Sequence, residues 1–273
     1  MRIIRVFPRR TKATPTDDLV AIARPPGFLD EADKVHISVT FTWDIERADL
    51  LAKLWGFVAP VEMGGPALDT IGGEFTPGLY LKPGYVITSR GCPNRCWFCS
   101  VWKRDGAIRE LPVVPGHIIA DDNLLACSES HVRAVFEMLS WQKLRAKFTG
   151  GLESARLEKW HAEALRELHP NSVYFAYDTP SDLEPLRHAG RLLKEAGVPQ
   201  SRLGCYVLCG YPGDTIGAAY KRMGEAFGAG FLPFGMLYRD PDGAEPQSFD
   251  WRIFQRRFTR PAITRRILKE AIA

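Results

Sequence analysis

Three cysteines that fall close together, Cys92, Cys96 and Cys99, are the residues of this chain best suited to metal chemistry. A β-branched run over residues 86–88 precedes them, and glycine, proline and arginine interrupt the stretch that follows, which predicts a strand running into a loop. Structural zinc takes four protein ligands, usually as two pairs, so the spacing Cys-x3-Cys-x2-Cys is a poor zinc pattern. Thiolates also hold iron–sulfur clusters, and three of them would leave one iron of a [4Fe–4S] cluster open to a substrate.

Two other interpretations of the three cysteines remain open. The first is a zinc loop completed by one more residue, in a protein that binds metal without catalysing a reaction. The second is that the cysteines pack as small apolar side chains. A loop that contains Pro93 and Arg95 is a poor place to bury three thiols, which argues against the second interpretation.

The cysteine spacing, with the aromatic Phe98 directly before the last cysteine, resembles the signature of the radical S-adenosylmethionine (SAM) superfamily. The resemblance implies that Cys92, Cys96 and Cys99 hold a [4Fe–4S] cluster whose open iron is chelated by the amino and carboxylate groups of SAM. An electron from a flavodoxin or a ferredoxin-type protein would then cleave SAM to a 5′-deoxyadenosyl radical. Phe98 would lie near the adenine.

The same resemblance assigns further cofactor-binding residues. Most members carry a Gly-Gly-Glu-like motif after the second barrel strand, where this chain has Asp121-Asp122-Asn123; these oxygens can still accept hydrogen bonds from an ammonium group. The segment around Glu153 and Arg156 is similar to a Gly-Leu-Asp-x-x-Arg segment of a poorly characterised branch. Glu153 would bind the ribose hydroxyls and Arg156 the methionine carboxylate. The remaining candidates are Asp178, Gly210 and Tyr211, the last two in the family's adenine-contacting segment.

Alternating strands and helices must position these residues. Six β-branched or aromatic runs separated by amphipathic segments predict a parallel sheet with right-handed crossovers. In such sheets ligands bind at the carboxyl ends of the strands, which is where the polar candidates recur. The resemblance implies a partial (βα)6 barrel, a partial TIM-type barrel, over residues 85–240. The predicted strands lie near residues 85–88, 116–120, 146–152, 172–178, 203–212 and 232–238.

Residues 1–84 predict a smaller unit. A strand over residues 35–43, a helix over residues 44–55 with Asp44 as its N-cap, and a short strand over residues 60–66 form a βαβ pattern. The segment resembles a reduced form of the Rossmann-like domain of cobalamin-binding relatives. It lacks their Asp-x-His-x-x-Gly motif, so we predict no cobalamin. The Gly64-Gly65 pair forms either a simple turn, which we favour, or a phosphate contact.

The C-terminal tail, residues 241–273, is basic. From Trp251 onward it has seven Lys and Arg residues against one acid, interleaved with Trp251, Phe254 and Phe258. A basic helix with aromatic residues could bind nucleic acid or phosphates. We favour the alternative, in which the aromatic side chains close the open side of the barrel and the cations face solvent.

Composition sets the wider bounds. The chain has 273 residues, of which 45% are hydrophobic and 25% charged, as in an ordinary globular α/β protein. No apolar run reaches the roughly 18 residues of a membrane span, and the apolar run at the start is too short for a signal peptide. Six cysteines without a disulfide-like spacing predict a reducing, cytoplasmic environment. We therefore predict no membrane partner.

Substrate identity is only weakly bounded by the sequence. The net charge of +4 permits an anionic substrate, and we favour a small molecule or a nucleobase or nucleotide. Peptide-modifying members of the superfamily usually carry a longer cysteine-rich extension, which this chain lacks. The remaining cysteines, Cys127, Cys205 and Cys209, could ligate a second cluster, but their wide spacing favours packing in the core. Cys209, nearest the predicted strand ends, could pack likewise or give a hydrogen atom to a substrate radical.

Overall fold

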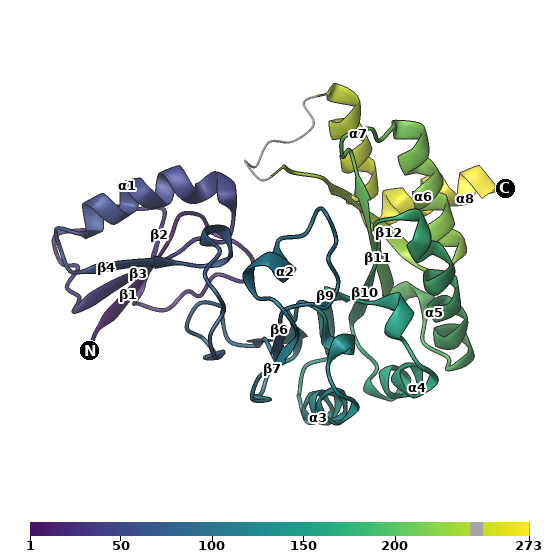
Figure 1. Ribbon diagram of the computed structural model, residues 1–273, viewed down its shortest axis with the longest axis horizontal. Coiled ribbons are helices and arrows are strands. Elements are labelled where there is room, and N and C mark those ends of the chain that lie inside the picture. Colours follow the sequence, from purple (N-terminus) through teal and green to yellow (C-terminus); the bar gives the residue numbers. More distant parts are fainter. Residues whose placement is uncertain (241–247, 273) are drawn as a thin grey trace.

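The computed structural model describes residues 1–240 and 248–272. It confirms an α/β protein with parallel sheets: one sheet of four strands, one of six, and a short two-stranded hairpin. Figure 1 shows the four-stranded sheet on the left and the six-stranded sheet on the right. Each larger sheet belongs to its own hydrophobic cluster. No helix in the described residues is long and apolar enough to cross a bilayer.

The N-terminal sheet is wholly parallel and has the order β2-β1-β3-β4. Helix α1 covers one of its faces and buries Ala48, Leu51 and Trp55 against the sheet (Figure 1). The predicted strand–helix–strand unit is present, but its first strand stops at Ser38, and residues 42–44 form a 3₁₀ turn instead of continuing it. Two further strands were not predicted. The elements are β1 Ile3–Phe7, β2 Val20–Ile22, β3 Lys34–Ser38, α1 Ile45–Trp55 and β4 Val61–Gly64.

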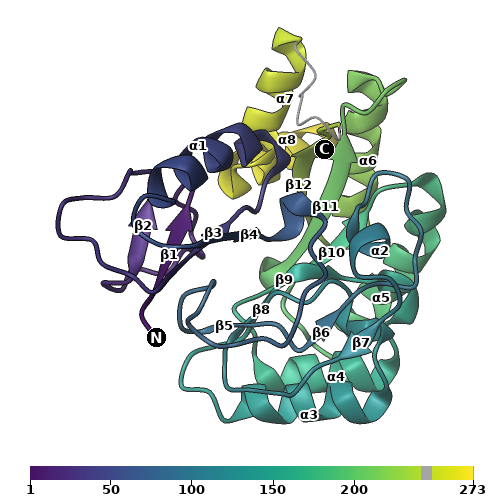
Figure 2. The same ribbon diagram turned by 60° about the vertical axis from the view of Figure 1, so that its left-hand side comes forward.

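The second sheet contains all six strands predicted from residue 85 onward, and their order in the sheet follows their order in the chain. Every neighbouring pair is parallel. Four helices connect consecutive strands from β8 to β12 and run along the outside of the sheet (Figure 2). The strands are β5 Tyr85–Val86, β8 Ile118–Ile119, β9 Lys147–Leu152, β10 Ser172–Tyr177, β11 Leu203–Cys209 and β12 Leu232–Leu237; the helices are α3 Glu129–Ser140, α4 Lys159–Leu168, α5 Leu183–Glu195 and α6 Ile216–Gly228.

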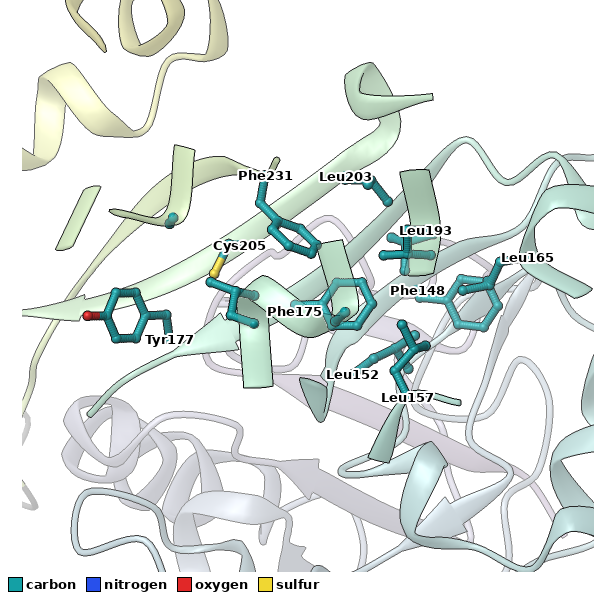
Figure 3. Close-up of a cluster of buried hydrophobic side chains, with 14 of the residues drawn as sticks. Phe148, Leu152, Leu157, Leu165, Phe175, Tyr177, Leu193, Leu203, Cys205 and Phe231 are labelled. Carbon is teal, nitrogen blue, oxygen red and sulfur yellow. The ribbon is translucent and has the colours of Figure 1, made fainter. Parts of the chain in front are cut away.

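The main core lies between this sheet and its helices. Alternate residues of β10 point toward the helices, and Phe175 is fully buried with its ring 5.1 Å from that of Phe231 (Figure 3). Burial of one such side chain contributes about 1.5–3 kcal/mol. The opposite face of the same strands carries a row of aromatic rings. Tyr174 and Tyr206 stack with their centroids 4.6 Å apart, and Phe234 meets Tyr206 edge-on.

The connection from β5 to β8 has a different form. It contains the antiparallel hairpin β6 Ser89–Arg90 with β7 Arg109–Glu110, and the single-turn helix α2 Val101–Arg104 between them. The three clustered cysteines lie between β6 and α2. In the described residues, five short 3₁₀ helices come after strands, and a sixth directly precedes β11. In chain order they are η1 Thr42–Asp44, η2 Pro66–Leu68, η3 Leu124–Ala126, η4 Ser154–Arg156, η5 Pro180–Asp182 and η6 Gln200–Arg202.

The C-terminal helices α7, Phe249–Phe258, and α8, Pro261–Ile272, pack beside β12 at the end of the sheet (Figure 1). Gly235 of β12 makes the contact close, since a Cβ atom there would lie 3.3 Å from Phe258. Trp251, Phe254 and Phe258 are buried, in line with the interpretation favoured from the sequence. The predicted start of this tail, residue 241, lies outside the described residues, as does Ala273.

Candidate functional site

The cysteine loop, residues 91–100, follows β6 and has a defined backbone path. Gly91 begins it with φ of +85°, and a Cβ atom there would lie 2.3 Å from the carbonyl oxygen of Ala107. Only glycine fits this position, because both the dihedral angle and the contact exclude a side chain. The Cys92 N–H donates to the Gly106 carbonyl at 3.1 Å, which ties the loop to the chain that leaves it.

The three loop cysteines are partly buried free thiols. The pKa of Cys96 is raised to about 11, first by burial and then by the charges of Cys99 and Cys92. Burial is also the main cause that raises the pKa of Cys99, with a smaller contribution from Cys92. The sulfur atoms are therefore close enough to interact electrostatically. The thiols of Cys96 and Cys99 are therefore protonated at neutral pH, and binding of a metal would have to displace these protons.

No group of three His, Cys, Asp or Glu side chains in residues 1–240 and 248–272 is arranged to hold a single metal ion. A structural zinc ion needs four ligands that converge on one point. In a four-iron cluster each thiolate binds a different iron, so the cysteines surround the cluster instead of one ion. The cluster stays a prediction, and its donor set of three free thiols on one loop has the chemistry that an iron–sulfur cluster requires.

Asp121 and Asp122, which follow β8, both bind the backbone that leads into the cysteine loop. The buried Asp121 carboxylate accepts hydrogen bonds from the Thr88 N–H at 2.7 Å, the Thr88 hydroxyl at 2.6 Å and the Ser89 hydroxyl at 2.8 Å. Asp122 accepts from the Gly91 N–H at 2.9 Å. Burial raises the pKa of both carboxyl groups. The two side chains thus fix where the loop begins.

Asn123 is the member of this triplet that faces the cysteines. Its Nδ2 donates to Cys92 Sγ at 3.3 Å and to Glu153 Oε2 at 2.7 Å. Its Oδ1 is buried and has no hydrogen-bond partner, and the same holds for Oγ of Ser154, on the residue after Glu153. A buried polar atom without a partner costs free energy, and the Asn123 oxygen in particular lacks a donor.

Glu153 and Arg156 lie together at the carboxyl end of β9. Glu153 Oε2 accepts from Arg156 Nε at 2.7 Å as well as from Asn123. The Arg156 side chain is 40% exposed, so its remaining N–H groups are open to a further acceptor. The structure therefore brings together Cys92, Asn123, Glu153 and Arg156 from three strand ends, as the sequence predicted. Ser154 was missed, because a serine in a turn has no distinguishing sequence signal.

Asp178 follows β10 and is mostly buried. Its pKa is raised to about 7, mainly by burial and then by the negative charge of Asp182; the Leu208 N–H and Arg222 act in the opposite direction. Asp178 and Asp182 both act electrostatically on Cys96. Asp178 is therefore within electrostatic range of the cysteine loop, and its carboxyl group can exchange a proton near neutral pH.

Gly210 and Tyr211 follow β11, and a buried ion pair positions both residues. Asp214 accepts from the Gly210 N–H at 2.8 Å and from Arg222 at 2.6 Å. The Arg222 guanidinium lies 5.3 Å from the Tyr211 ring centroid in a cation–π contact. Sequence reasoning missed Asp214 and Arg222. Their roles depend on a turn and a helix that bring them to the same strand end.

Trp97 links the cysteine loop to the far side of the sheet, and sequence reasoning missed it. Its ring lies 5.7 Å from Tyr211 and 5.5 Å from Tyr238, and Phe98 contacts it edge-on at 5.5 Å. Trp97 is 54% exposed despite these contacts. The loop and the ends of β11 and β12 thus form an aromatic surface that is open to a planar ligand. Phe98 was predicted to contact adenine, and it is part of this surface.

The other three cysteines lie outside the cysteine loop. Cys205 and Cys209 are fully buried in β11, which agrees with packing. The Cys209 thiol donates to the Met236 carbonyl at 3.3 Å, and its pKa is raised to about 12 by burial and by Asp214. Cys127 is partly buried. We assign no catalytic role to Cys209, because a thiol in this position has no exposed surface to offer a substrate.

The fold and the site together define an α/β protein with a cysteine loop at the carboxyl edge of a parallel sheet. No protein-family model matches the chain, and no curated protein matches it either. The case for a particular family therefore depends on the cysteine loop and the residues that surround it.

Proposed function

We propose that this chain is a radical SAM enzyme in which Cys92, Cys96 and Cys99 hold a [4Fe–4S] cluster. When bound and reduced, the cluster supplies the electron that cleaves SAM to a 5′-deoxyadenosyl radical, which abstracts hydrogen from a substrate. The observation that carries the proposal is the unpaired Asn123 Oδ1 beside Cys92. An ammonium group next to the cysteine loop would supply the missing donor, and SAM carries such a group.

The sheet supports the same proposal at the level of the fold. Six parallel strands in chain order, with helices on one side, are the arrangement that a partial (βα)6 barrel requires. We propose that residues 85–240 form such a partial barrel. The cysteine loop and all the polar candidates follow strand ends at its carboxyl edge, the edge at which parallel α/β folds bind ligands.

Each remaining candidate has a role that its surroundings support. Arg156, held by Glu153, would pair with the methionine carboxylate, and Glu153 itself would accept from the ribose hydroxyls. The aromatic surface of Trp97, Phe98 and Tyr211 would take the adenine or a planar substrate. Asp178 would move a proton near the cysteine loop.

A small molecule, nucleobase or nucleotide is the proposed substrate, and a flavodoxin or ferredoxin-type protein is the proposed electron donor, in the cytoplasm. The stacked Tyr174 and Tyr206 on the face of the sheet away from the helices support a planar substrate. The alternative is a nucleic-acid substrate reached through exposed cations of α7 and α8, such as Arg256 and Arg265. A mobility-shift assay with DNA and tRNA at physiological salt separates the two.

Anaerobic reconstitution with iron and sulfide tests the proposed function. We expect about four irons per chain, and 5′-deoxyadenosine after reduction in the presence of SAM. Cys99→Ala should lose iron and product together, because it removes a loop thiol. Cys127→Ala is the matched control, since it removes a partly buried thiol outside the loop, and it should retain both. Zinc without iron in anaerobically purified protein would support the metal-binding alternative and refute the proposed function.

A further inference from the structure

A second cavity lies between the N-terminal sheet and the two ends of the cysteine loop. Its volume is about 330 Å³, near the lower end of small-ligand sites. Its walls come from β3 and β4, from residues 70–73, and from the two arginines that flank the cysteine loop, Arg90 and Arg104. It is distinct from the SAM site proposed above, because Asn123, Glu153 and Trp97 are not among its lining residues.

The sheet face that lines this cavity is unusually polar. Val35 and Ile37 of β3 are buried in the cluster under α1, whereas His36 and Ser38 point to the opposite face. Glu62 lies beside His36 in the neighbouring strand and continues this polar face. Parallel sheets normally bury apolar side chains on both faces. A polar face over a hollow is what a binding site would need, and packing alone does not explain it.

Arg90 provides the charge that defines the cavity. Its Nε is buried without a hydrogen-bond partner. The described residues offer its guanidinium no hydrogen bond and no ion pair. Gly72 lies directly against this side chain, since a Cβ atom at Gly72 would be 2.6 Å from Arg90 Nε. A partly buried guanidinium without a partner costs free energy that a bound anion would recover.

The other charged groups around the cavity are already paired, and this contrast singles out Arg90. Arg104 donates to Asp105 at 2.7 Å. The one acid among the lining residues, Glu62, is exposed and forms an ion pair with Lys34 at 2.7 Å. Among the groups that act on the pKa of Asp122, Arg90 has the smallest effect, and the two side chains form no ion pair.

We infer that this cavity binds a small molecule through a phosphate or carboxylate group, with Arg90 as its principal partner. A planar guanidinium matches either oxyanion through two parallel hydrogen bonds. The polar face of β3 and β4 would contact the rest of the ligand. The inference does not depend on the proposed function, because it requires neither iron nor SAM.

Thermal unfolding of the purified chain without iron provides the test. Sodium phosphate and sodium malonate are added separately, with sodium chloride at equal ionic strength as the baseline. We expect at least one of the two anions to raise the melting temperature above the chloride baseline, and the anion that does so identifies the group. Arg90→Gln should weaken the apparent affinity about tenfold or more, since a charged hydrogen bond is lost. Arg10→Gln removes the same charge from an exposed position and should respond like the wild type.

A second pair of variants keeps the test decisive if Arg90→Gln fails to fold. Gly73 lines the cavity, and an added Cβ atom there meets nothing within 4 Å. Gly73→Asp should abolish the stabilisation by placing a carboxylate beside the anion, whereas the matched Gly73→Asn should retain it. Two results would overturn the inference: neither anion stabilises the wild type beyond chloride, or the Asp and Asn variants respond equally.

Discussion

Asn123 is the residue on which the proposed SAM site depends most, because its amide nitrogen already forms hydrogen bonds and its amide oxygen forms none. Its amide nitrogen serves Cys92 and Glu153, and its oxygen lacks a donor. We expect Asn123→Ala to weaken SAM binding to the reconstituted protein by about tenfold or more, with iron content unchanged. Equilibrium dialysis with SAM measures the affinity.

The control for this prediction is Asn171→Ala, an exposed asparagine ahead of β10 on the opposite edge of the sheet. It should bind SAM as the wild type does. If Asn123→Ala also binds SAM normally while retaining its iron, the role assigned to the unpaired oxygen is wrong.

Asp178 gives the protein a specific pH dependence. Burial and the charge of Asp182 raise its pKa to about 7 in the folded chain, against roughly 3.9 in an unfolded one. The folded state therefore binds more protons than the unfolded state between these values, so the stability from this group is full below about pH 4 and is lost as pH rises through about 7. Asp178→Asn should flatten that decline.

Urea unfolding midpoints at about pH 5 and about pH 8 measure this effect. The wild type should lose more stability than Asp178→Asn over this interval, and the exposed Asp18→Asn should behave as the wild type does. Parallel declines in the wild type and Asp178→Asn would show that Asp178 titrates in its ordinary range.

At the scale of elements, the cysteine loop depends on how it leaves β6. Gly91 combines a positive φ with a backbone contact that leaves no room for a side chain, whereas Gly106 has a positive φ of +70° and open space around it. Gly91→Ala should therefore cost more stability than Gly106→Ala, by about 1–3 kcal/mol, and should reduce iron loading. Denaturant unfolding and iron analysis of the two variants provide the comparison, and equal losses would contradict the close contact.

The long strands are predicted from the sequence much better than the short ones. Strands such as β10 and β11 carry continuous β-branched and aromatic residues, and these were predicted within a few residues. β2 has only three residues in a proline-containing stretch, and its pairing with β1 is long-range. The hairpin of β6 and β7 joins segments across the cysteine loop. Such short elements exist because of tertiary contacts, which no local pattern records.

At the scale of the whole molecule, α7 completes the end of the large sheet. Phe258 is fully buried and lies against Gly235 of β12. Phe258→Ala should lower the free energy of unfolding by about 3–5 kcal/mol, because it leaves a cavity between the helix and the strand. Arg256→Ala, on the exposed side of the same helix, should change it little. A similar result for the two variants in denaturant unfolding would mean that α7 does not stabilise the sheet.

The site was predicted from the sequence only where the chemistry is local. The cysteines, Asn123, Glu153 and Arg156 follow strands in readable motifs, and the structure places Cys92 and the last three together. Trp97 contacts Tyr211 and Tyr238, which lie more than a hundred residues further along the chain. Nor does the sequence show that the Asp121 carboxylate is occupied by hydrogen bonds from Thr88 and Ser89. Those bonds depend on how β8 lies against the start of the loop.

The hydrogen bonds that Asp121 and Asp122 accept from the start of the cysteine loop have a consequence for assembly. They join protein groups alone, so the loop acquires its shape when the polypeptide folds. If the proposed cluster binds here, iron and sulfide could be inserted late, into a folded protein, without the large structural rearrangement typical of zinc fingers. A colourless preparation would be a folded precursor awaiting its inorganic part, and circular dichroism would barely distinguish it from the mature form.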